Sequence, residues 1–288
     1  MNTNTIIQLA QGSPEWHAYR LSKRNASESA AVLGISPWMT PYQLWLVKTG
    51  RYVTEVRTAM QRGTDLEPAA RAAYEAQTGL VMQPLVLEAG AYSASLDGMT
   101  LEGDLIVEIK CPYKGQASDL WQDASSGVVP DHYITQIQHQ LMLSGAATAH
   151  LWVYDGNVGF LVEVTRDDDY MVRIRNAWDE FQTYLDTDTP PPLTEADTLV
   201  RSDAAWAEAA TVFTQAKRLA DEQAELLEAA RKALVALASH PKESGAGVSV
   251  KRFWKAGNVE YKRMPQLQGV DLDHYRGKAR EEVRVSVS

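Results

Sequence analysis

The sequence predicts an α/β fold in which a small mixed sheet is flanked by helices, followed by a separate C-terminal extension. Up to about residue 188, segments with helical apolar spacing alternate with short segments rich in β-branched residues. Three consecutive prolines at 190–192 then interrupt the chain, because proline cannot continue a helix. One long heptad pattern follows them. We therefore expect two domains, 1–188 and 189–288.

The helical segments of the first domain are marked by their end signals. A short helix over 25–34 has Asn25 or Ser27 as alternative N-caps and ends at Gly34, and a second runs from about Pro41 to Gly50. Three longer helices are expected around 62–79, around 132–146 and from about Asp168 to Tyr184.

Five strand patterns complete this domain. The stretches LVMQPLVLE, AYSASLDGM and LIVEIKCP precede the helix around 132–146, and HLWVYDG and VGFLVEVTR follow it. LIVEIKCP is stopped by Pro112, which cannot donate to a strand ladder. Together with the helices, these strands predict a small mixed sheet.

The C-terminal extension is expected to hold a helix from about Asp203 to Ser239. Its heptad seam is alanine-rich and includes Gln223, so we expect it to pack within its own subunit or against a neighbour rather than form an independent zipper. The seam comprises Val212, Ala216, Leu219, Gln223, Leu226, Ala230, Ala233 and Leu237. The segment DLDHYRGKAREEVRVSVS predicts a final short helix and a strand.

The segment VSVKRFWKAGNVEYKRM predicts a β-hairpin that turns at Gly257 and Asn258. Basic residues interleaved with aromatics suit single-stranded nucleic acid, but the aromatics could instead pack on the long helix. The residues concerned are Lys251, Arg252, Lys255, Lys262 and Arg263, around Phe253, Trp254 and Tyr261.

Composition and charge exclude several classes of protein. The net charge of -9 argues against a protein that coats nucleic acid indiscriminately, but a nuclease needs only a local positive track. Cys111 is the single cysteine, which excludes an intramolecular disulfide and a cysteine-ligated metal site within one chain. No apolar run approaches the roughly 20 residues of a membrane span, and the N-terminus lacks a secretory pattern. We expect a cytoplasmic protein without a membrane partner, with Cys111 as a small buried hydrophobe.

The stretch LIVEIKCP carries the strongest chemical pattern. Glu108 and Lys110 are two residues apart on a predicted strand, so their side chains share one face. Asp97 ends the preceding strand pattern, and antiparallel pairing of the two strands would bring it next to Glu108.

Two adjacent carboxylates repel each other unless a cation lies between them, and Mg²⁺ or Mn²⁺ is the natural hard cation for oxygen ligands. Lys110 could then orient or deprotonate a water, or offset charge on phosphorus. This Asp–Glu–x–Lys pattern resembles that of PD-(D/E)XK nucleases, although a solvated surface pair is the alternative for Glu108 and Lys110.

Other candidate residues have two readings each. Glu67 fits a capping box with Thr64, or it reaches the metal site from a helix. Gln136 shares a helical face with Tyr133 and Gln140, and these glutamines are either solvated or bind a phosphate oxygen or a metal-bound water.

A basic segment near the N-terminus also has two interpretations. Arg20, Lys23 and Arg24 precede the helix start at Asn25 to Ser27, where an anion could bind. The alternative is a basic turn followed by an N-cap serine.

Six motifs occur in the order typical of one family: WHAYRLSKRNASE, LGISPWMTPYQLWLVKTG, RGTDLEPAARAAYE, SLDGM, VEIKCP and HYITQIQHQLML. Over roughly residues 14–165 the chain resembles the YqaJ-type viral recombinase family, whose members are phage lambda exonuclease-like. The resemblance implies a PD-(D/E)XK, restriction-endonuclease-like core. The last hundred residues depart from lambda exonuclease, whereas longer YqaJ-type proteins carry similar tails.

The resemblance also implies a role for each candidate residue. Asp97, Glu108 and the Ile109 carbonyl would bind metal, and Lys110 would be the catalytic lysine. Glu67 and Gln136 would lie beside the metal. Arg20 and Ser27 would hold the 5′-terminal phosphate, with Tyr133 also contacting DNA.

The activity implied is a two-Mg²⁺ exonuclease, with Mn²⁺ able to substitute, that degrades one strand of duplex DNA from its 5′ end. The 3′ overhang would pass to a single-strand annealing protein, and the enzyme would be a homotrimeric ring. The alternatives are an end-independent endonuclease on the same core and a non-catalytic recombination adaptor.

Overall fold

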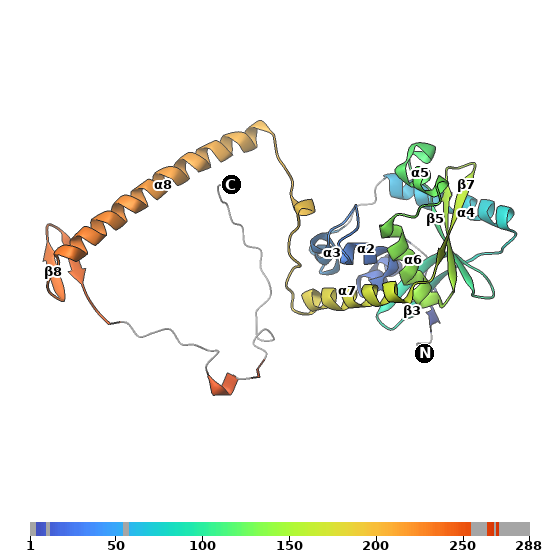
Figure 1. The fold of residues 1–288 in the computed structure, drawn as a ribbon, viewed down its shortest axis with the longest axis horizontal. Coiled ribbons are helices and arrows are strands. Elements are labelled where there is room, and N and C mark those ends of the chain that lie inside the picture. Colours follow the sequence, from blue (N-terminus) through green and yellow to red (C-terminus); the bar gives the residue numbers. More distant parts are fainter. Residues whose placement is uncertain (1–3, 10–11, 54–57, 255–263, 268, 271–288) are drawn as a thin grey trace. The chain divides into compact units, whose positions relative to one another are not determined.

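The computed structural model describes residues 4–9, 12–53, 58–254, 264–267 and 269–270, without the side chains of 58–60 and 266. The chain separates into two compact units, Met1–Thr198 and Leu199–Ser288 (Figure 1). Among the described residues, no helix combines the length and apolar character needed to cross a membrane.

Unit 1 is built on a seven-stranded mixed sheet with the order β1-β3-β4-β5-β6-β7. Neighbours along this order are antiparallel except β5 and β6, while the short β2 pairs with β4 in parallel. The strands are β1 Thr5–Ile6, β2 Arg24–Asn25, β3 Gln83–Ala89, β4 Tyr92–Met99, β5 Leu105–Lys110, β6 Thr148–Tyr154 and β7 Gly159–Thr165. The predicted α/β class and all five predicted strands are confirmed.

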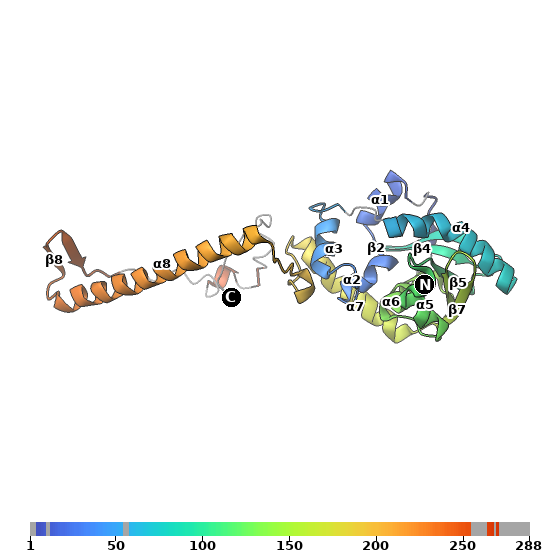
Figure 2. The same ribbon diagram turned by 90° about the horizontal axis from the view of Figure 1, so that it is seen from above.

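Helices pack on both faces of this sheet (Figure 2). They are α1 Pro14–Leu21, α2 Ser29–Val32, α3 Pro41–Lys48, α4 Thr58–Thr78, α5 Asp119–Ser125, α6 Asp131–Ser144 and α7 Asp168–Asp186. Short 3₁₀ turns occur at η1 Ala26–Glu28, η2 Gly115–Ala117 and η3 Glu195–Asp197. Most helix ends follow the expected signals. Thr40 forms a capping box with Gln43 at the start of α3, and Gly145 ends α6 in the left-handed conformation.

Even- and odd-numbered residues of β5 are buried on opposite faces of the strand. Ile106 packs with Ile137 and Leu141 of α6 in one core cluster, whereas Val107 and Ile109 pack with Ala70 and Tyr74 of α4 in another. This alternation follows from the two-residue period of a strand. It places Glu108, like Ile106, on the face covered by α6.

The segment 25–34 differs from the single helix predicted for it. Asn25 lies in β2, beside β4, and the chain then forms η1 and α2 before Gly34. Asn25 makes no side-chain cap; its amide binds the Arg20 and Lys23 carbonyls instead. The buried side chain of Asn25 thus fixes the preceding turn rather than starting a helix.

In unit 2 the described residues form the long helix α8, Ala204–Leu237, a hairpin of β8 Lys242–Gly245 and β9 Val248–Lys251, and the 3₁₀ turn η5 Pro265–Leu267. The N-cap of α8 is Asp203, which accepts a hydrogen bond from the Trp206 amide. None of its residues is buried, and the heptad residues Val212, Leu219 and Leu226 are exposed.

The hairpin differs from the one expected. Val248–Lys251 pairs with the preceding Lys242–Gly245 and turns through Ala246 and Gly247, both with positive φ. Positive φ at both central residues is the geometry of a tight hairpin turn, which the glycine-rich segment supplies. The predicted turn at Gly257 and Asn258, and the predicted final helix and strand, lie outside the described residues.

Candidate active site

The pairing of β4 with β5 ends at the two residues that the sequence singles out. The ladder joins Met99 to Ile106 and Gly98 to Val107, so Asp97 comes opposite Glu108. At this point the Asp97 side chain, rather than a backbone carbonyl, is the acceptor: its Oδ2 accepts a hydrogen bond from the Ile109 amide at 2.7 Å. The expected antiparallel pairing is present, and it holds one carboxylate beside the other.

Glu108 is a buried carboxylate surrounded by donors. Its side chain is 2% exposed. Oε1 accepts from Lys110 Nζ at 2.5 Å and from Gln136 Nε2 at 2.6 Å, and Oε2 accepts from Gln140 Nε2 at 2.5 Å. A buried carboxylate without such donors would be costly. The two glutamines, one turn apart on α6, therefore fix its position, and the solvated alternative for Gln136 is wrong.

Lys110 lies at the partly open end of this cluster. Its Nζ is 5.2 Å from the centroid of the Tyr133 ring, and a quarter of its side chain is exposed. Burial by itself lowers the pKa of Lys110, but Glu108, Tyr133 and Asp97 outweigh that effect and raise this pKa above its ordinary value. The amine is therefore held as an ammonium beside Glu108.

Negative charge is crowded around Asp97. Burial raises its pKa well above the ordinary value, and Glu108 and Glu67 raise it further, against the opposing effects of Lys110 and the Ile109 amide. The pKa of Glu67 is also raised, chiefly by burial, although Arg71 opposes this from 3.1 Å. Three carboxylates thus influence one another here.

The predicted capping box between Thr64 and Glu67 is wrong. Helix α4 begins at Thr58, so Thr64 lies inside it and cannot be its N-cap. The sequence pattern had placed the start of this helix at the Arg62-Gly63-Thr64 segment, one turn later than in the structure. Glu67 instead pairs with Arg71 one turn later.

The donor chemistry of this cluster fits a hard divalent cation. Asp97, Glu108 and the Ile109 carbonyl would offer oxygen ligands, and among the described residues Lys110 and Arg71 are the cations that lower the pKa values of Asp97 and Glu67. Within the described part of the chain, no group of three or more His, Cys, Asp or Glu side chains is arranged to hold a metal ion. The ligand set expected from the sequence would thus consist of two carboxylates and one backbone carbonyl.

An aromatic group borders Lys110 that the sequence reasoning did not single out. Trp38 packs edge-on against His132 at 4.8 Å and lies 5.8 Å from Tyr133, measured between ring centroids. Trp38 is 59% exposed. The signal in the sequence was weak, because a tryptophan in a loop before a helix is usually read as core.

Cys111 follows β5 and is half-buried against Tyr74 and its neighbours. Burial raises the pKa of the Cys111 thiol to about 11, and Asp97 and Glu67 contribute to that shift. The protonated thiol is unsuited to nucleophilic attack.

Arg20 and Ser27 meet at a second place in unit 1. Arg20 Nη2 donates to Ser27 Oγ at 2.9 Å, and the guanidinium lies over the Trp16 ring at 4.5 Å. The other two basic residues of the segment turn elsewhere: Lys23 pairs with Glu88 and Arg24 with Asp179. The segment is therefore not one basic patch, and Arg20 with exposed Ser27 forms its candidate anion pocket.

The carboxylate cluster and the Arg20–Ser27 pair are both positioned by strand β4 and helix α6. Strand β4 carries Asp97 and also pairs with β2 next to the Arg20 turn, while α6 carries Gln136 and packs against η1, which holds Ser27. The sheet and one helix thus fix the pocket relative to the carboxylate cluster.

The chain is similar to several known proteins over this unit. Residues 15–147 match the family model of the YqaJ-like viral recombinase domain. Over 177 residues the chain is 29% identical to the uncharacterized protein YqaJ of Bacillus subtilis (strain 168). The matched region covers 58% of this chain and 54% of that protein. The chain thus spans about half the length of this curated relative.

Two crystal structures of LHK-Exo, an alkaline exonuclease from Laribacter hongkongensis, also match. One contains dAMP; both superpose with a TM-score of 0.53 and 28% identity, over 61% of this chain and 94% of theirs. The predicted PD-(D/E)XK-type core is confirmed by this likeness.

Proposed function

We propose that the protein is a metal-dependent exonuclease that degrades one strand of duplex DNA from its 5′ end, because residues 15–147 match the family model of the YqaJ-like viral recombinase domain. The observation that carries the proposal is the cluster at the end of the β4–β5 ladder, where Asp97, Glu108 and Lys110 meet. The likeness to LHK-Exo supports it. The product would be a 3′ overhang for a single-strand annealing protein.

Asp97, Glu108 and the Ile109 carbonyl would hold the cation, which we propose to be Mg²⁺ as two ions, with Mn²⁺ able to replace it. Bound there, the ions would supply activation of the attacking water and neutralisation of the leaving oxygen. Glu67 lies on helix α4, and its charge raises the pKa of Asp97. It would help to orient that water.

The protein's own residues would do the remaining work. Gln136 and Gln140 hold Glu108 in place through its two oxygens, so its position does not have to be set during the reaction. The Lys110 ammonium, whose pKa is raised, would offset negative charge on the phosphorus rather than remove a proton. Tyr133, beside Lys110, would contact the DNA strand.

Arg20 and Ser27 would bind the 5′-terminal phosphate. A guanidinium and a hydroxyl 2.9 Å apart present adjacent donors to a phosphate, and such charge-assisted contacts are the strong ones. Because the pocket and the cluster are fixed by the same strand and helix, recognition of the end would set which bond reaches the cluster.

The test uses the full chain with linear and covalently closed duplexes, each with Mg²⁺, with Mn²⁺ or with EDTA. The proposal predicts mononucleotides from linear duplex only, with loss of a 5′ label before a 3′ label, and no products in EDTA. Cutting of closed circles would identify an endonuclease instead. DNA binding without cleavage in either metal would identify an adaptor.

A further inference from the structure

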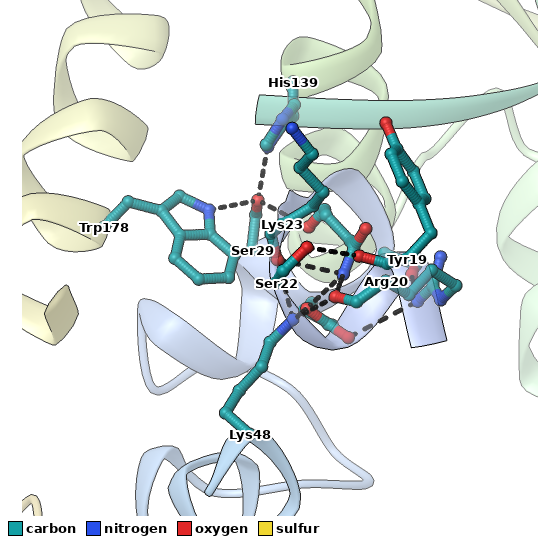
Figure 3. A network of polar contacts seen from close by, with 11 residues as sticks. Tyr19, Arg20, Ser22, Lys23, Ser29, Lys48, His139 and Trp178 are labelled. Carbon is teal, nitrogen blue, oxygen red and sulfur yellow. Dashed lines mark hydrogen bonds and ion pairs between the residues drawn. The ribbon is translucent and has the colours of Figure 1, made fainter. Parts of the chain in front are cut away.

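The end of α1, which carries Arg20, and the turn that follows it contact a buried lysine, Lys48, from helix α3 (Figure 3). Its side chain is 2% exposed. The ammonium has three donors, and three acceptors surround it: the carbonyls of Arg20 at 2.8 Å and Lys23 at 2.7 Å, and Glu28 Oε2 at 2.7 Å. One lysine therefore ties the end of α1, the following turn and η1 together.

The distances around Glu28 show which of two cations forms the stronger ion pair with it. Glu28 Oε2 contacts Lys48 at 2.7 Å and Asn25 Nδ2 at 2.8 Å, whereas Glu28 Oε1 is 3.4 Å from Arg20 Nη2. The Lys48 pair is the closer and the more buried of the two, so it is the stronger. Counting Arg20 and Lys48 against Glu28, the group keeps one positive charge in excess, and that charge lies on the more exposed Arg20.

We propose that Lys48 is a positioning residue for the 5′-phosphate pocket: by binding Glu28 at 2.7 Å it keeps that carboxylate from pairing more closely with Arg20, whose contact with Glu28 is the longer one at 3.4 Å, and it thereby leaves the guanidinium able to bind a terminal phosphate. This inference rests on the proposed function, since it concerns how the same enzyme recognises DNA ends. Lys48 itself does not touch the phosphate. Without it, Glu28 would turn to Arg20, and a phosphate would have to compete with a carboxylate already in place.

The effect of Lys48 on the charge of Glu28 can be separated from its support of the turn, because Asn25 binds the same two backbone carbonyls as Lys48. The Asn25 amide donates to the same two carbonyls, Arg20 at 2.7 Å and Lys23 at 3.1 Å. In Lys48→Met the turn therefore keeps one donor for each carbonyl, while Glu28 loses the closer of its two cations and keeps Arg20. The double variant Lys48→Met/Glu28→Gln then removes the unbalanced carboxylate as well.

The experiment measures the binding of the full chain to blunt duplexes that carry either a 5′-phosphate or a 5′-hydroxyl, by fluorescence anisotropy in EDTA so that nothing is cleaved. The readout is the ratio of the two dissociation constants. Lys48→Met should lower the preference for phosphate by about tenfold, the size of one charge-assisted contact. The double variant should restore most of the preference. Arg20→Ala should abolish it.

The control is Arg51→Met, which removes a cation just after the same helix but one that pairs with Asp188; it should keep the wild-type ratio. An unchanged ratio in Lys48→Met, or no recovery in the double variant, overturns the inference while leaving the proposed function standing. A wild-type ratio of one contradicts the proposed function itself. If Lys48→Met does not fold, Glu28→Gln alone decides, because it should tighten phosphate binding and any other result refutes the inference.

Discussion

Glu108 shows how a charged group is kept inside this fold. Its carboxylate is almost fully buried, and three side-chain donors from β5 and α6 surround it. Each donor replaces part of the hydration that burial removes, and each also restricts where the oxygens can lie. The same contacts thus serve stability and the arrangement of the site.

Gln140→Leu tests this double role. It removes the donor to Glu108 Oε2 and leaves a buried acceptor short of one partner, which should cost about 1–3 kcal/mol of unfolding free energy. The rate of cleavage at saturating DNA should also fall. Chemical denaturation and single-turnover digestion measure the two effects. Gln138→Leu is the control: Gln138 binds the Thr165 carbonyl and the Asp167 amide, so it should lower stability without changing the rate. Equal rate losses in both variants would refute the role of Gln140.

His139 predicts a pH dependence of stability. It is fully buried on α6, its Nδ1 lies 2.6 Å from Ser29 Oγ, and Ser29 Oγ accepts from Trp178 (Figure 3). Burial lowers the pKa of His139 to about 3. In the unfolded chain this pKa is about 6.5. As pH falls below that value the unfolded state alone takes up a proton, so the free energy of unfolding should decrease down to about pH 3.

The variant His139→Gln isolates this contribution. The variant cannot take up the proton, so its stability should fall less steeply between pH 6.5 and 4, by up to about 1.4 kcal/mol per pH unit. Urea denaturation across this range gives both slopes. Parallel slopes would mean that His139 is protonated within the fold.

Sequence reasoning reached part of this site, for identifiable reasons. Glu108 and Lys110 share a face because strands have a fixed period of two, and an apolar strand makes that period easy to recognise. Gln140 and Trp38 could not be assigned in the same way. A glutamine on a helix and a tryptophan in a loop have no distinguishing pattern until the fold shows what they contact.

At the scale of elements, the important feature is the point where β4 and β5 stop pairing. Gly98 follows Asp97 in β4 and pairs with Val107 of β5, and a Cβ at Gly98 would lie 2.7 Å from Met82 Cβ and 2.9 Å from Val107 Cγ1. Only glycine fits so close an approach. A glycine directly after Asp97 is thus a requirement of packing beside this carboxylate.

Gly98→Ala should therefore destabilise the fold by about 1–3 kcal/mol, as overpacking in a core does. It should also slow cleavage, because the displaced strand carries Asp97. Gly63→Ala is the matched control: Gly63 lies in α4 with nothing within 4 Å of a built Cβ, so stability should stay equal or rise by up to about 1 kcal/mol. Denaturation curves give both values. A Gly98→Ala protein as stable as wild type would contradict this packing.

The elements differ in how well the sequence predicted them. Long segments such as α6 and β7 were found because their apolar period extends over several turns or residues. The β2–η1–α2 segment was not, since β2 is only two residues long and exists because β4 lies beside it. Tertiary pairing of this kind leaves no local pattern.

The whole molecule has to reconcile a net charge of -9 with a DNA substrate. An acidic chain repels DNA at long range unless its positive groups gather on one surface. We propose a homotrimeric ring, in which a central channel would collect the positive groups of three subunits. The exposed apolar residues of α8, including Leu226 and Leu237, are available for contact with another surface.

Multi-angle light scattering on the purified protein tests the ring. We expect a mass three times that of one chain at micromolar concentration, together with digestion of many nucleotides per binding event. Such processivity follows when DNA is enclosed topologically. A monomer mass combined with processive digestion would rule out the ring and leave unit 2 as the candidate clamp.

The central claim is that Asp97, Glu108 and Lys110 form a hydrolytic site. Its most direct test is the single-turnover rate of 5′-end cleavage on linear duplex with Mg²⁺ for wild type, Asp97→Ala, Lys110→Ala and the control Lys114→Ala, whose lysine is exposed after β5. Asp97→Ala and Lys110→Ala should lose at least about a hundredfold in rate, as expected when preorganised charge is removed, and should still bind DNA ends. Lys114→Ala should match wild type. A Lys110→Ala protein that cleaves at the wild-type rate would contradict the account.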